Sequence, residues 1–254
     1  MKQSGTCLTR PTEYQSYNGL TTPFITRGAQ ALGIALPPSA PAAFEHYYEL
    51  LETHGKGINL TAISGAEGVA TLHFLDSLAL LNAAQFGSAK VIDIGSGAGF
   101  PGVPLAIAEP SIDLTLLDST GKRTEFLSHL CAALSIDAAY VHARAEDAAR
   151  DPSHRGKYDI AVSRAVAKLN ALCELCLPFV RTGGMFIAMK GPAPDGEVSE
   201  ADSAIAALGA ELQGLHSYAI PGTDVARCAV IIRKTSETLD KYPRRYARIQ
   251  KAPL

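Results

Sequence analysis

Short runs of Val, Ile and Leu alternate with amphipathic segments along most of the chain from residue 90 onward. Apolar runs bounded by turn residues predict buried strands, and apolar positions at three- and four-residue spacing predict helices. The predicted strands cover residues 90–94, 113–118, 138–142, 157–162, 184–190, 211–219 and 226–233. The predicted helices between them cover residues 101–109, 121–135, 145–150, 167–177 and 197–208. Strands that alternate with helices predict a doubly wound, mostly parallel seven-stranded α/β sheet.

Both ends of the chain depart from this alternation. The last two strands have no helix between them and meet near Pro221 and Gly222, which predicts an antiparallel hairpin at one edge of the sheet. Helical patterns that precede the first strand, and that we expect to cap the sheet, cover residues 24–33, 39–54 and 66–84. The expected organisation is one globular unit with a loose extension (1–22), a helical cap (23–85), the sheet domain (86–234) and a basic tail without a core pattern (235–254).

The first strand-to-strand connection carries more glycine than packing requires. The stretch from Lys90 to Asp118 predicts a strand, a glycine-rich turn, a helix and a second strand, with glycines at 95, 97, 99 and 102. Glycine permits positive φ and a close approach of backbone to ligand, and the helix start behind the turn presents unpaired N–H groups. Asp118, at the end of the second strand, is placed to accept hydrogen bonds from ribose hydroxyls. We therefore expect a nucleoside-containing cofactor across the carboxyl ends of the strands.

The glycine spacing by itself leaves two cofactors open. Gly97, Gly99 and Gly102 fit the dinucleotide fingerprint G-x-G-x-x-G. Gly95, Gly97 and Gly99 follow Asp93 in an acid-x-G-x-G-x-G turn, which is similar to the first motif of S-adenosylmethionine (SAM) methyltransferases. A carboxylate before the turn repels a pyrophosphate but accepts a hydrogen bond from an ammonium group, so Asp93 favours SAM.

Polar residues also follow the later strands. The third strand is followed by Arg144–Glu146, the fourth by Ser163 and Arg164, and the fifth by Lys190. Because the carboxyl ends of parallel strands meet at one edge of a sheet, these residues predict a site there. Glu146, or the backbone of Ala145, is placed to meet an adenine amino group.

Several catalytic signatures are absent from the sequence. No N-P-P-Y segment follows the fourth strand, and no Pro-Cys nucleophile and no Ser-His-Asp order stand out. A methyl acceptor that needs neither deprotonation nor a covalent adduct fits this absence, and guanine N7 is such an acceptor. Catalysis would then rest on in-line positioning of the two reacting atoms.

His73 and Asp76 lie three residues apart in the predicted helix 66–84, so they share one face. Two interpretations of this pair are open. The spacing alone favours a surface pair over two polar groups at a substrate mouth.

Composition and charge narrow the class of protein. The chain lacks an apolar run long enough to span a membrane and lacks the apolar core of a signal peptide near Met1, so we expect a cytoplasmic protein without membrane contact. Five scattered cysteines do not indicate a disulfide framework, and we expect Cys173 and Cys176 to be buried helix residues and no metal to be bound. A net charge of −2 argues against a general nucleic-acid binder.

The charge is unevenly distributed. From Arg233 to Lys251 there are seven basic and two acidic residues, a local charge of +5. Such a tail can contact phosphates, or it can be a solvated segment that only aids solubility, and the charge alone does not separate the two.

Six segments in a fixed order resemble the bacterial ribosomal RNA small subunit methyltransferase G family. They are Asn59–Ile63, His73–Leu78, Asp93–Gly102, Arg144–Glu146, Ser163–Ala167 and Lys241–Arg245. The Phe-Pro-Gly after the glycine turn and the Lys-Tyr-Pro-Arg of the tail are the specific ones. The resemblance covers all but the first ~22 residues. It implies the class I SAM-methyltransferase fold, which is Rossmann-like, and transfer of a methyl group from SAM to N7 of a guanine in the 530-loop region of 16S rRNA, position 527 in rRNA numbering.

The resemblance also implies roles for individual residues. Expected cofactor contacts are Asp93, Gly95, Gly97, Gly99, Phe100, Asp118, Ser119, Thr120, Ala145, Glu146 and Arg164. Expected RNA contacts are Arg123, Lys190, Lys241, Arg244, Arg245, Arg248 and Lys251. No catalytic base is expected, and the candidates for positioning are Arg164, Lys190, Asn59 and His73. The expected product of the cofactor is S-adenosylhomocysteine. The protein is expected to be a monomer that binds 16S rRNA or the 30S subunit, and no binding of DNA is expected.

Two departures from the family pattern concern RNA docking. His54 stands where the family often has a tryptophan, and Ala247 where the tail usually has a glycine. Two other function classes stay open beside the methyltransferase. One is a nicotinamide-dependent oxidoreductase that uses Gly97, Gly99 and Gly102, and the other is a SAM-binding assembly factor that transfers no methyl group.

Overall fold

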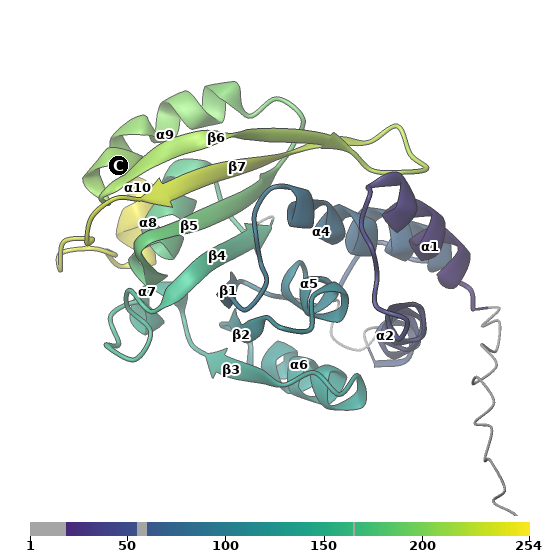
Figure 1. Cartoon of the computed structure of the whole chain (residues 1–254). Helices are drawn as coiled ribbons and strands as arrows, with labels where there is room; N and C mark the ends of the chain where they lie inside the picture. Colours follow the sequence, from purple (N-terminus) through teal and green to yellow (C-terminus); the bar gives the residue numbers. More distant parts are fainter. Residues whose placement is uncertain (1–18, 55–59, 165) are drawn as a thin grey trace, which may run out of the picture.

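One sheet organises the described part of this computed structural model, which comprises residues 19–54, 60–164 and 166–254. Its seven strands are β1 (Lys90–Ile94), β2 (Asp113–Asp118), β3 (Ala138–His142), β4 (Tyr158–Arg164), β5 (Val180–Lys190), β6 (Ala210–Ala219) and β7 (Ala226–Lys234). They lie in the order β3-β2-β1-β4-β5-β7-β6 (Figure 1). The first five strands pair parallel, and β7 runs antiparallel to both β5 and β6. This is the class I methyltransferase arrangement, so the predicted fold and edge hairpin are confirmed.

Helices cover both faces of the sheet and create two hydrophobic cores. The first core includes residues of α1 (Thr22–Ala31), α2 (Ala40–His54), α5 (Gly102–Ala108) and α6 (Gly121–Ala133). The second includes residues of α7 (Ala145–Ala148), α8 (Leu169–Cys176), α9 (Asp195–Ala207) and α10 (Tyr246–Lys251). Neighbours in β1 divide between the cores, with Val91 in the first and Ile92 in the second. Burial on both faces explains why these strands are continuous apolar runs rather than alternating ones.

The predicted helix 66–84 is helical but not uniform. It consists of α3 (Ala66–Val69), the π-helical turn η2 (Ala70–Leu75), α4 (Asp76–Leu78) and the 3₁₀ turn η3 (Ala79–Asn82). His73 lies in the π turn, and its side chain and that of Asp76 are both buried. The expected surface pair is therefore wrong, because this face of the segment packs inward. Single π turns are frequent at functional sites.

The predicted boundaries at the two ends of the chain need different corrections. Of the expected loose extension 1–22, residues 1–18 lie outside the described residues. The end of the extension is fixed to the helical cap, since the backbone N–H groups of Leu20 and Thr21 donate to the Glu45 carboxylate at 2.9 and 2.8 Å. The tail was expected to lack a core pattern, but Tyr242 and Ile249 are buried in the second core. Two apolar residues in a basic segment are a weak pattern.

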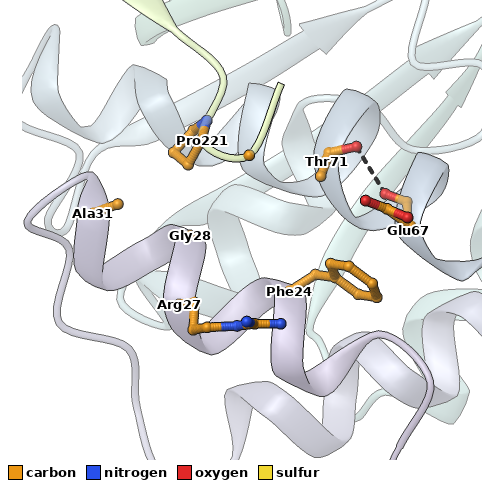
Figure 2. A pocket seen from close by; sticks show the side chains of 8 residues that line it. Phe24, Arg27, Gly28, Ala31, Glu67, Thr71 and Pro221 are labelled. Carbon is orange, nitrogen blue, oxygen red and sulfur yellow. Dashed lines mark hydrogen bonds between the residues drawn. The ribbon is translucent and has the colours of Figure 1, made fainter. Parts of the chain in front are cut away.

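Helix α1 approaches the π turn so closely that Gly28 has no room for a side chain. A Cβ atom on Gly28 would lie 2.1 Å from Cδ1 of the buried Leu75. Figure 2 shows this part of α1 from a neighbouring hollow of about 360 Å³, which Phe24, Thr71 and Pro221 also line. None of the residues predicted to bind cofactor or RNA lines this hollow.

Gly28→Val is expected to lower the free energy of unfolding by about 1–3 kcal/mol, because an added side chain in a packed contact forces α1 away from Leu75. The measurement is urea unfolding followed by circular dichroism. Ala31→Val, which places the same side chain on an exposed position of α1, is the matched control. Equal stability of the two variants would contradict the close helix contact.

Candidate functional site

The turn after β1 is tied to the end of β2 by backbone and carboxylate hydrogen bonds. The N–H groups of Gly95 and Ser96 donate to the carbonyl oxygen of Leu117 at 2.8 and 3.1 Å. The buried Asp118 carboxylate accepts from the N–H of Gly97 at 3.0 Å and from that of Thr120 at 2.8 Å. Asp118 therefore fixes the glycine turn to the start of α6, in addition to any contact it makes with a ribose.

At three positions of this turn, a side chain would come too close to a different neighbour. Gly95 has φ of +76° and lines a hollow at the sheet edge, and a Cβ there would lie 2.7 Å from Val166 Cγ2. A Cβ on Gly99 would meet the Tyr47 hydroxyl at 2.5 Å, and one on Gly102 would meet Asp93 Oδ2 at 2.9 Å. All three glycines are therefore needed for close packing of the turn, and Gly95 also lines the hollow.

A hollow of about 340 Å³ lies at the carboxyl ends of β1, β2, β3 and β4. Predicted site residues that line it are Gly95, Asp118, Ser119, Arg123, Ala145, Glu146 and Arg164. Arg144, which belongs to the predicted strand-end segment Arg144–Glu146, also lines it, and residues that line it without having been predicted are Ile94, Leu117, Ala143, Val166, Leu175 and Tyr246. Predicted cofactor contacts that do not line it are Asp93, Gly97, Gly99, Phe100 and Thr120. The predicted positioning residue Asn59 lies outside the described residues.

Asp93 directly precedes Ile94 and Gly95, which line the hollow, and is completely buried. Its Oδ2 accepts a hydrogen bond from the Gly102 N–H at 2.8 Å, at the start of α5, and its Oδ1 has no partner among the described residues. Burial raises the pKa of Asp93 to about 7 against the opposing effects of the Gly102 N–H and Arg164. A buried carboxyl oxygen without a partner is costly, and such groups concentrate at functional sites.

Arg164 is fixed at one side of the hollow by the helical cap. Its guanidinium donates to Asp76 at 3.1 Å, to the Leu72 carbonyl oxygen at 3.2 Å and to His73 Nδ1 at 3.0 Å. The ring centroid of Phe100 lies 4.9 Å from the guanidinium carbon of Arg164. Phe100 therefore contacts a residue that lines the hollow but does not line the hollow itself. The cap therefore positions the arginine that follows β4, and His73 and Asp76 are parts of the site rather than of the surface.

His73 is neutral in this arrangement. Burial and the neighbouring Arg164 charge lower the pKa of His73 to about 3. Its ring also stacks on Phe100 with a centroid distance of 4.4 Å. An imidazole held in this way orients its neighbours and is not a general base at neutral pH.

Lys190 is less available than expected. Its ammonium donates to the Ala167 carbonyl oxygen and to Glu197, both at 2.9 Å, so it links the segment after β4 to α9. The predicted roles in positioning and RNA contact are untested, but the observed partners give Lys190 a structural function.

The tail separates into buried and exposed cations. Arg244 donates from its backbone N–H, Nε and Nη2 to the Glu174 carboxylate of α8 at 2.6–2.8 Å, and Glu174 is 0% exposed. The guanidinium of Arg244 is thus occupied inside the protein, and we remove it from the expected RNA contacts. Tyr246 lines the hollow at the sheet edge, while the exposed cations of the tail are Lys241, Arg245, Arg248 and Lys251.

Two further expectations concern features of the described residues. Cys173 and Cys176 are buried in α8, as predicted. In residues 19–54, 60–164 and 166–254, no group of three or more His, Cys, Asp or Glu side chains is arranged to bind a metal ion. Within the same ranges, every helix is too short or too polar to traverse a lipid bilayer.

Three known proteins are similar to this chain. A solved structure of TrmN from Thermus thermophilus is 17% identical with a TM-score of 0.49, covering 63% of this chain and 48% of that one. A Ribosomal RNA small subunit methyltransferase G from Pelotomaculum thermopropionicum is 44% identical over 232 residues, which are 91% of this chain and 97% of the relative. A protein of the same name from Clostridium botulinum is 46% identical and covers 83% of this chain and 89% of that relative.

The family profile described as "rRNA small subunit methyltransferase G" matches residues 41–223. This range includes the helical cap residues that hold Arg164, the glycine turn and all the strands that border the hollow. On the profile match and the two relatives together, this chain belongs to the ribosomal RNA small subunit methyltransferase G family and is a methyltransferase.

Proposed function

We propose that the protein transfers a methyl group from SAM to N7 of guanine 527 in the 530-loop region of 16S rRNA. The observation that carries the proposal is the hollow at the carboxyl edge of the sheet, which Asp118, Glu146 and Arg164 line together. Family membership supports the substrate class, and a 16S rRNA substrate places the protein in the cytoplasm.

The residues present fit SAM in two respects. Oδ1 of Asp93 has no partner among the described residues and can accept from an ammonium group, and Gly95 lines the hollow with backbone that carries no Cβ. Asp118 and Ser119 would contact the ribose, and Ala145, Glu146 and Tyr246 would surround the adenine. The cofactor supplies an electrophilic methyl group.

The protein's part in the reaction is orientation and exclusion of water. Guanine N7 has a free lone pair, so no residue needs to remove a proton and no covalent intermediate is required. Arg164, which Asp76 and His73 hold in place, would lie beside the reacting atoms and limit their movement. We therefore propose in-line transfer without a catalytic base.

Arg123, which lines the hollow with a side chain that is 39% exposed, and the exposed tail cations are proposed to contact phosphates. A double substitution, Arg245→Gln with Arg248→Gln, is expected to weaken 30S binding and to reduce the slope of log K against log salt by about 1 for each phosphate that is no longer bound. Filter binding over a potassium chloride series measures this slope. Arg181→Gln, an exposed arginine paired with Asp159 in β4, is the control. An unchanged slope in the double variant would assign the tail to solubility.

The proposed function is tested by methyl transfer from labelled SAM to 30S subunits that lack the modification. Strand cleavage specific for 7-methylguanine is expected at one position of the 530 loop. SAM binding without incorporation would favour the non-catalytic assembly factor, and retention of a nicotinamide dinucleotide without SAM binding would favour the oxidoreductase.

A further inference from the structure

The hydroxyl of Thr61 lies beside the network that fixes Arg164. Its Oγ1 is 2.6 Å from His73 Nε2 and accepts a hydrogen bond from the Ile63 N–H at 3.0 Å. Thr61 is half-buried, in the segment that joins α2 to α3. The direction of the hydrogen bond between Thr61 and His73 decides what the hydroxyl hydrogen can do.

The position of the proton on His73 follows from Arg164. A guanidinium has only donors, so His73 Nδ1, at 3.0 Å from Arg164 Nη2, must accept and carries no proton. The ring is neutral, so its one proton is on Nε2, which donates to Thr61 Oγ1. Both lone pairs of the Thr61 oxygen are then used, one by His73 and one by Ile63. The hydroxyl hydrogen is left as a donor, and within the described residues no acceptor for it is found.

Thr61 is linked through His73 to Arg164, which lines the hollow. His73 stacks on Phe100 and bonds to Arg164, and Arg164 lines the hollow, so Thr61 is two hydrogen bonds away from its wall. Glu146 and Tyr246, proposed to surround the adenine, belong to other elements, α7 and α10. A donor on the cap side is therefore a candidate for contact with the methyl acceptor rather than with the nucleoside.

Building on the proposed function, we propose that Thr61 donates its hydroxyl hydrogen to O6 of the target guanine. N7 and O6 are neighbouring acceptors on the same edge of guanine. Because N7 must stay free to receive the methyl group, O6 is the acceptor next to it that a protein donor can bind. Adenine carries an amino donor at that position, so a hydroxyl whose lone pairs are both occupied rejects it.

The test compares two RNAs and three proteins. The RNAs are 30S subunits with guanine or 2-aminopurine at the target position, since 2-aminopurine keeps N7 but lacks O6. The proteins are the wild type, Thr61→Val, which removes the hydroxyl, and Thr61→Ser, which keeps it. The readouts are kcat/KM for methyl transfer, the Kd for SAM and the melting temperature, with Thr26→Val at an exposed threonine as the control.

The wild type is expected to lose roughly tenfold in kcat/KM when guanine is replaced by 2-aminopurine, the effect of one neutral hydrogen bond. Thr61→Val is expected to lose the same factor on guanine and nothing further on 2-aminopurine, with the Kd for SAM within twofold of the wild type. Thr61→Ser is expected to retain the preference for guanine, which also shows that a poorly folded valine variant is not the cause.

Other outcomes overturn the assignment. If the Thr61→Val protein still prefers guanine to 2-aminopurine tenfold, Thr61 does not donate to O6 in the wild type. A valine variant that loses SAM affinity and keeps the guanine preference assigns the hydroxyl to the cofactor. Failure of the wild type to methylate the guanine-containing subunit rejects the proposed function, and this assignment falls with it.

Discussion

Arg244→Met will lower the free energy of unfolding by about 3–5 kcal/mol, because it leaves the Glu174 carboxylate buried without its ionic partner. Glu174 is 0% exposed and accepts four hydrogen bonds of 2.6–3.1 Å from Arg244. The substitution removes the three that come from the side chain and keeps the one from the backbone N–H. Urea unfolding at neutral pH measures the loss.

Two further variants make the cause of this loss clear. Arg245→Met alters the neighbouring exposed arginine and is expected to change stability by less than about 0.5 kcal/mol. Glu174→Leu combined with Arg244→Met removes both charges and is expected to recover most of the stability. A single Arg244→Met variant as stable as Arg245→Met would contradict a buried ion pair between α8 and the tail.

The ion pair between Arg244 and Glu174 alters the expected effect of deleting the tail. A solvated tail would leave cofactor binding intact when deleted. In the structure, Tyr246 lines the hollow that we propose for SAM, and Arg244 neutralises the buried Glu174. Deletion of residues 235–254 is therefore expected to reduce both stability and SAM binding. Point substitutions of Arg245 and Arg248 therefore test RNA contact more cleanly than truncation.

The parts of the site that sequence reasoning could find are those encoded within one strand-turn-helix unit. The glycine turn and Asp118 lie within thirty residues of each other, and local propensity and spacing define them. The mostly parallel sheet with its antiparallel edge hairpin was predictable for the same reason, since alternating strands and helices admit few arrangements.

Contacts between distant segments were not predictable in this way. Arg164 and Asp76 are 88 residues apart, and Arg244 and Glu174 are 70 apart. One signal did exist for the second pair: Glu174 is a lone charge within the apolar segment 169–180, and a buried charge requires a partner. The sequence does not say which of the basic residues supplies it, because many exposed cations satisfy the same charge requirement.

Asp93→Asn is expected to weaken SAM binding while it removes a pH-dependent cost to stability. Oδ1 of Asp93 is unpartnered among the described residues, and an amide in its place cannot offer an anionic acceptor to an ammonium group. Loss of one charged hydrogen bond corresponds to a Kd for SAM that rises roughly 10- to 100-fold. Isothermal titration calorimetry at pH 8 measures this, with the exposed Asp113→Asn as control.

The stability effect has a definite sign. Burial raises the pKa of Asp93 from 3.8 to about 7 in the folded state, so the folded protein binds this proton more tightly than the unfolded chain does. Stability from this group is therefore lost as pH rises from about 4 to about 7, by up to roughly 4 kcal/mol, and stays constant above that. Asparagine does not titrate, so the stability of Asp93→Asn relative to the wild type should increase through this window. The effect of His73 on acid stability is shared by both proteins and cancels in the difference. A difference independent of pH would mean that Asp93 is not a strained carboxylate kept for the cofactor.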